Sequence, residues 1–117
     1  MKKILVVTVL LATVAGCSRG KQTHTIADVA KAETITLQKG SSQGDIHYMT
    51  VVGKGYLDGT AEIVLILDGK PYKTEKLSGD VAFEWSGDWY SNSARIEYKP
   101  SSVKSGSLSL QYTFKDM

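Results

Sequence analysis

The side chains best suited to chemistry are few in this sequence, and their spacing does not predict an active site. His47 is the only histidine after residue 32, and it falls in an apolar stretch where histidine usually packs or lies at an edge. A hydrolase would need His47 beside a carboxylate and a serine in one cleft. The serines instead gather in turns and on polar strand faces. We therefore expect no catalytic residue, no metal site and no cofactor.

A Ser-Gly-Asp triplet occurs twice, at residues 78–80 and 86–88, and could suggest a pair of acidic ligands. The residues between the triplets alternate between apolar and polar, which predicts a strand. A strand of that length would hold Asp80 and Asp88 about 20 Å apart, too far to share a calcium ion. We interpret both triplets as turns.

Aromatic residues offer the clearest binding hypothesis. Trp85 follows Val81 and Phe83 at strand spacing, so the core is its default position. Trp89 and Tyr90 are adjacent and would point to opposite faces of a strand. An aromatic side chain left exposed could stack on a sugar or anchor a protein partner. Trp85, Trp89 and Tyr90 are therefore the candidate binding residues.

The first 17 residues have the layout of a secretory signal peptide. Two lysines follow Met1, an apolar run covers residues 4–14, and two small residues precede Cys17, the only cysteine. The run is much shorter than the roughly 20 residues that a membrane-spanning helix needs. The leader therefore predicts export and removal of residues 1–16.

The end of this leader resembles the lipobox of bacterial lipoproteins, over residues 1–17 only, through its last four residues: Val14, Ala15, Gly16 and Cys17. The resemblance implies that the Cys17 sulfur receives a diacylglycerol and that a fatty acid such as palmitate caps the new amino group. Two or three chains would hold firmly, since each buried methylene contributes about 0.8 kcal/mol. Because Ser18 is not aspartate, the resemblance implies the outer membrane in a host with two membranes. We expect a lipid-anchored protein of the cell envelope.

The charge of the mature chain is balanced. The full sequence carries a formal charge of +2, and Lys2 and Lys3 leave with the leader. Nucleic-acid binding needs a basic surplus, so we expect no such partner. With Cys17 used by lipid, no thiol remains for a disulfide or a metal site.

Residues 17–32 are polar without alternation and predict a lipidated cysteine followed by a flexible tether. A short helix after Thr25 is the alternative, because Thr25 and Asp28 resemble a capping box. From residue 33 the hydrophobic period changes to two, which predicts a single β domain over residues 33–117. Gly53 and Gly55 predict a kink, and Asp-Gly pairs at 58–59 and 68–69 predict hairpin turns. Lys70, Lys73 and Lys76 predict an edge strand protected by charge.

Seven or eight short strands joined by turns predict an all-β fold. We favour an antiparallel β-sandwich, Ig-like in general shape, and keep a small β-barrel as the second possibility. The cysteine, tryptophan, cysteine pattern of antibody domains is absent.

The expected function is a non-catalytic binding or scaffold module in the bacterial cell envelope, with a protein or glycan partner. The alternative is an inhibitor or immunity-type lipoprotein that blocks an envelope hydrolase, a toxin or a phage. Loops at residues 39–44 or 100–106 would then be the blocking element. A hydrolase that uses His47 is the third possibility.

Overall fold

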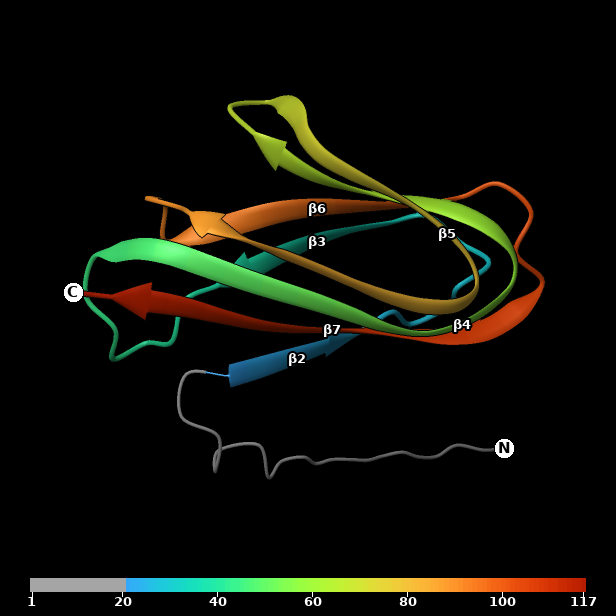
Figure 1. The fold of residues 1–117 in the computed structure, drawn as a ribbon, viewed down its shortest axis with the longest axis horizontal. Helices are drawn as coiled ribbons and strands as arrows, with labels where there is room; N and C mark the ends of the chain where they lie inside the picture. Colours follow the sequence, from blue (N-terminus) through green and yellow to red (C-terminus); the bar gives the residue numbers. More distant parts are fainter. Residues whose placement is uncertain (1–20) are drawn as a thin grey trace.

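The computed structural model describes residues 21–117, whose strands form one antiparallel sheet (Figure 1). No helix occurs within this range, so the predicted all-β class is confirmed. In chain order the strands are β2 (Lys21–Thr25), β3 (Glu33–Gln38), β4 (Ile46–Leu67), β5 (Lys70–Asp88), β6 (Ser93–Pro100) and β7 (Ser105–Asp116).

Strand β4 is the centre of the sheet. Its first half pairs with β7 on one side, its second half pairs with β6 on that same side, and β5 follows it along the other side. Strand β2 lies outside β7, and β3 lies outside β6. One half of the sheet contains β2 and β7, and the other half contains β6 and β3. Because β4 and β5 run through both halves, the sheet curls into a half-barrel whose two halves face each other across the core (Figure 1). This shape lies between the predicted sandwich and the barrel.

The corner of the curl lies where turns were expected. The predictions of turns at residues 58–59 and 78–80 are wrong, because β4 and β5 continue through them, and the prediction at residues 86–88 is wrong because these are the last three residues of β5. Leu57 pairs with Gly79 and Thr60 with Ser78, with a register shift between them, so both strands bend together without ending. Gly59 has a φ of +136°, and a Cβ there would overlap a backbone oxygen of the loop between β6 and β7. The same turn-forming residues therefore make a bend within fewer, longer strands.

The turn predicted at residues 68–69 is confirmed. Asp68 and Gly69 have φ values of 54° and 76°, as a type I′ turn requires. The tip of this hairpin projects from the rest of the sheet (Figure 1) and is exposed. Within residues 21–117, β5 pairs only with β4, so the prediction of a charged edge strand is also confirmed.

The segment expected to be a tether belongs to the folded domain from Lys21 onward. Strand β2 pairs with β7 over five residue pairs, and residues 26–32 are irregular, so the alternative helix is not formed among residues 21–32. The inward side chains of β2 are polar, so its sequence does not show the alternation of apolar and polar residues that predicts a strand. His24 Nε2 lies 2.8 Å from Glu33 Oε2, and Gln22 Nε2 donates to Gln38 O at 3.0 Å. These side-chain contacts join β2 to β3, two strands that have no backbone hydrogen bonds to each other.

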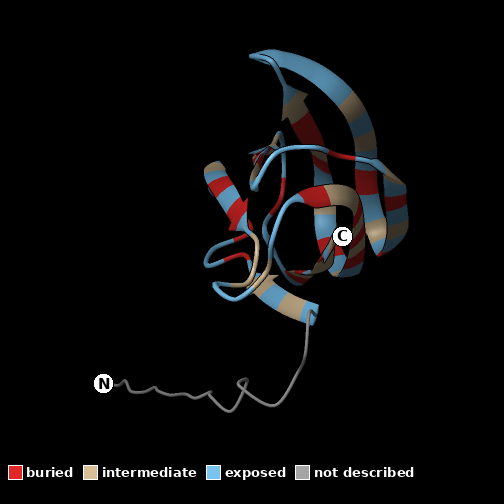
Figure 2. Ribbon diagram, turned by 90° about the vertical axis from the view of Figure 1, so that its left-hand side faces the viewer, coloured by how far each residue is buried: buried red, intermediate tan, exposed pale blue. Residues whose placement is uncertain are grey.

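The segment between β2 and β3 caps the core. Ile26 and Val29 are buried there. The Tyr98 hydroxyl, fully buried, donates to Val29 O at 2.6 Å. Burial raises the pKa of Tyr98 above its usual value, and the nearby Asp28 carboxylate adds to the shift. Buried and exposed residues alternate along the strands (Figure 2), as expected for a sheet with one face on a core.

Candidate functional site

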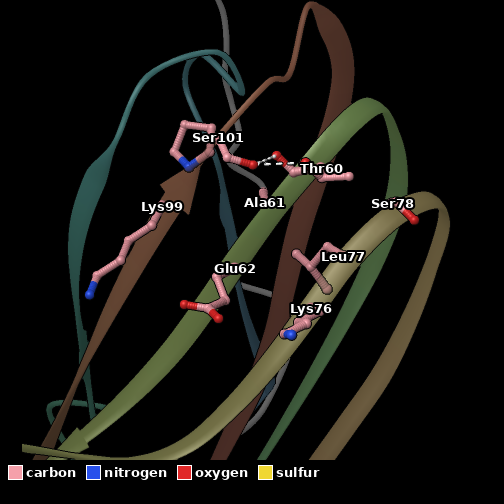
Figure 3. Close-up of a pocket in the computed structure, with 9 residues that line it drawn as sticks. Thr60, Ala61, Glu62, Lys76, Leu77, Ser78, Lys99 and Ser101 are labelled. Carbon is pink, nitrogen blue, oxygen red and sulfur yellow. Dashed lines mark hydrogen bonds between the residues drawn. The ribbon is translucent and has the colours of Figure 1, made fainter.

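An open groove of about 630 Å³ lies at the corner of the curl, where β4 and β5 bend (Figure 3). It crosses β4 between β5 on one side and β6 on the other. Six of its nine lining residues have polar side chains, and the full lining is Thr60, Ala61, Glu62, Lys76, Leu77, Ser78, Lys99, Pro100 and Ser101.

The charged part of the groove is a row across three strands. Glu62 on β4 pairs in register with Lys76 on β5 and with Lys99 on β6. Side chains directly opposite each other in an antiparallel pair have Cβ atoms about 5 Å apart, so the Glu62 side chain lies between those of Lys76 and Lys99. Lys99 Nζ also lies 3.6 Å from Glu97 Oε1. The three lining charges sum to one positive charge, and Glu97 beside Lys99 offsets part of it, so the groove suits a polar ligand that has both donor and acceptor groups.

One end of the groove carries a cluster of hydroxyl groups. Thr60 Oγ1 lies 2.7 Å from Ser101 Oγ and 3.0 Å from Ser102 Oγ. The backbone N–H of Ser101 donates to Thr60 O at 2.9 Å, which fixes the loop after β6 against β4. Figure 3 shows Thr60 and Ser101 beside each other at this end. The Ser101 hydroxyl also donates to Thr60 O at 3.0 Å, so it is fixed in place and can accept a hydrogen bond from a ligand with little ordering cost.

The groove contains neither of the described histidines, and neither does the small cavity beside Trp89. His47 lies at a register irregularity of β4, where its carbonyl accepts the Trp89 N–H at 3.2 Å. Residues 40–44, Gly-Ser-Ser-Gln-Gly, match the Gly-x-Ser-x-Gly pattern of a nucleophile elbow. A nucleophile elbow is a turn from a strand into a helix, whereas these residues join two strands, so they do not have that geometry. Within residues 21–117 no three His, Cys, Asp or Glu side chains gather as metal ligands would.

The predicted binding residues separate by burial. Trp85 and Trp89 are only 6% and 5% exposed, so as they stand neither can stack on a partner. The Trp89 indole N–H donates to Ser93 O at 3.0 Å, and its ring lies 6.5 Å from that of Tyr72. Tyr90 is 75% exposed. Of the three candidates, Tyr90 alone presents a free aromatic ring.

The groove could not be identified from the sequence. Glu62, Lys76 and Lys99 each occupy an ordinary polar position of a strand, 14 or more residues apart in the chain. Only the register of three strands brings them into one row. Cys17 lies outside the described residues.

The comparisons concern the leader. The family model for the prokaryotic membrane lipoprotein lipid attachment site matches residues 1–18. The chain therefore carries a lipoprotein lipid attachment site, and this supports a lipid-anchored location in the cell envelope. No curated protein shows significant similarity to the chain. Among residues 21–117 no helix is long and apolar enough to cross a membrane.

Proposed function

We propose that this lipoprotein is a non-catalytic binding module, which uses the groove at the corner of the curl to hold a polar segment of an envelope protein or glycan. The observation that carries the proposal is the row formed by Glu62, Lys76 and Lys99 beside fixed hydroxyls in an open hollow. Such a lining supplies charge and hydrogen bonds in a set geometry, and polar groups of this kind give a binding site its specificity.

The place of the groove on the sheet supports this function. Lys21, the described residue nearest to Cys17, pairs with Thr113 of β7, whereas the corner of the curl lies beside Ser105. Eight residues of strand correspond to about 26 Å. The groove therefore lies far along the sheet from the anchored end, where a partner can reach it.

Crosslinking in intact cells tests the proposal. A photoreactive residue replaces Ser78, which lines the groove, and in a second strain it replaces Ala82, which is exposed on the same face of β5 outside the groove. We expect one discrete adduct from position 78 and none from position 82. The charge reversal Lys76→Glu should abolish that adduct, whereas reversal of the exposed Lys54 should leave it intact.

An adduct that forms equally at both positions, or that survives Lys76→Glu, would count against the groove. The same holds if position 78 gives no adduct while the protein is folded and anchored.

The inhibitor function is the second candidate, and one observation favours it. The projecting hairpin tip carries Leu67, 38% exposed, and Tyr72, 51% exposed. The loop at residues 39–44 is instead fixed against β7, because Gln43 Nε2 donates to Phe114 O. If inhibition of an envelope enzyme is found, Leu67→Ser with Tyr72→Ser should remove it, and Lys76→Glu should not.

A further inference from the structure

The spacing between the lipid attachment site and the sheet limits how the domain can stand on a membrane. Cys17 is the cysteine of the attachment site, and β2 begins at Lys21. Four residues span at most about 14 Å. The described domain measures 42 × 32 × 22 Å, so this link is short compared with the domain. The start of β2 must therefore stay close to the bilayer.

One hydrogen bond joins the start of β2 to the end of β3, and a second joins the residue after β3 to the turn between β5 and β6. Gln22 Nε2 donates to Gln38 O at the end of β3, and the next residue, Lys39, donates its N–H to Asn92 O at 3.0 Å. Asn92 belongs to the turn between β5 and β6, which also contains Tyr90. We call these three segments, residues 21–22, 38–39 and 89–92, the anchor-side end. Tyr90 is its exposed aromatic residue.

Hydrogen bonds of the buried Trp89 fix the turn that carries Tyr90. The Trp89 backbone N–H donates to His47 O, and its indole N–H donates to Ser93 O. With Trp89 fixed in the core, the adjacent Tyr90 points outward, 75% exposed. A tyrosine ring with an apolar body and a polar hydroxyl is well suited to the boundary between lipid headgroups and water.

Charges near this end do not favour one kind of lipid. Lys21, Lys39 and Lys115 supply positive charge, and three carboxylates oppose them: Asp45, Asp88 and Asp116. Asp116 accepts the Gly44 N–H at 2.7 Å, so part of this charge is already paired within the protein. Contact with a membrane would thus depend on the short link and on Tyr90 rather than on a basic patch.

We propose that the anchor-side end rests against the lipid headgroups, with the Tyr90 ring in the interfacial layer and the groove directed away from the membrane. The bilayer is the partner of this surface. The inference does not depend on what the groove binds, because it rests on the attachment site, the link length and the hydrogen bonds of the anchor-side end.

Quenching by labelled lipid tests the orientation. The full-length lipidated protein is placed in phosphatidylethanolamine and phosphatidylglycerol vesicles that contain a headgroup nitroxide lipid. Tyr90→Cys and Tyr56→Cys each supply one free thiol for a fluorophore, because lipid occupies Cys17. Tyr56 is a matched control: it is 52% exposed and pairs with Ser107, about 20 Å further along β7 than Thr113.

We expect the label at position 90 to lose most of its fluorescence and the label at position 56 to lose little. Equal quenching at the two positions, or stronger quenching at position 56, would overturn the proposal. Both residues are exposed, so neither substitution removes a buried contact. Circular dichroism of both labelled proteins checks that the sheet is retained.

Discussion

Replacing Tyr98 with phenylalanine should measure how firmly the segment after β2 is built into the domain. The substitution keeps the buried ring and removes only the hydroxyl that donates to Val29 O at 2.6 Å. A hydrogen bond of this kind contributes about 0.5–1.5 kcal/mol net, and a buried carbonyl left without a donor costs about 1–3 kcal/mol. We therefore expect Tyr98→Phe to lower the free energy of unfolding by about 1–2 kcal/mol. For a domain of this size that corresponds to a loss of roughly 4–16 °C in Tm.

The assay is urea and thermal unfolding of the full-length lipidated protein in detergent, followed by the fluorescence of the two buried tryptophans. Tyr56→Phe is the matched control, since Tyr56 is exposed and a surface change of this kind stays within about 0.5 kcal/mol. If the two variants unfold at the same urea concentration, the capping role of the segment around Val29 is refuted.

Alkaline pH gives a second signature of the same hydroxyl. Burial raises the pKa of Tyr98, so its neutral form is favoured in the folded state. The stabilisation that this gives is complete below the ordinary tyrosine pKa of about 10 and is lost as the pH rises through the raised value. Tyr98→Phe should lose less stability than the wild type above pH 10, and Tyr56→Phe should follow the wild type.

Three further predictions concern the lipid anchor at Cys17, the bend at Gly59 and the loss of stability at low pH. Cys17→Ser should abolish incorporation of a labelled fatty acid, and label retained in that variant would contradict the attachment site. Gly59→Ala should destabilise the protein by about 1–3 kcal/mol or more, because an L residue is strained at its φ of +136°, whereas Gly87→Ala, in open space, should be nearly neutral in urea unfolding. The Gly44 N–H lowers the pKa of Asp116, so its stabilisation is present above the ordinary value and is lost as the pH falls through the lowered one. Asp116→Asn should therefore show a smaller loss of stability than the wild type when unfolding is measured toward pH 2, and an unchanged acid profile would contradict this.

The strands that the sequence predicted well are those with one face on the core. In β7, Leu108, Leu110 and Phe114 are buried and the residues between them are more exposed, as their alternation indicated. Strand β2 was missed because its inward residues, Gln22 and His24, bind polar groups of β3 instead of burying apolar surface. Alternation detects a strand only where burial separates its two faces.

The turn signals show a different limit. Asp-Gly at residues 68–69 ends a strand, and Asp-Gly at residues 58–59 bends one that continues. Glycine permits the same unusual backbone angles in both places. Whether pairing stops or resumes after it depends on the strands alongside, and these lie far away in the chain.

The sequence by itself determined the lipid attachment site, the all-β class, the turn at residues 68–69 and the charged edge of β5. These features follow from short-range patterns of charge, size and polarity. The tertiary structure alone decided that β4 and β5 curl through both halves, that Tyr90 lies at the anchor-side end and that Glu62 stands between Lys76 and Lys99. Each of these depends on pairing between distant strands, whose register is set by the burial of the whole core rather than by neighbouring residues.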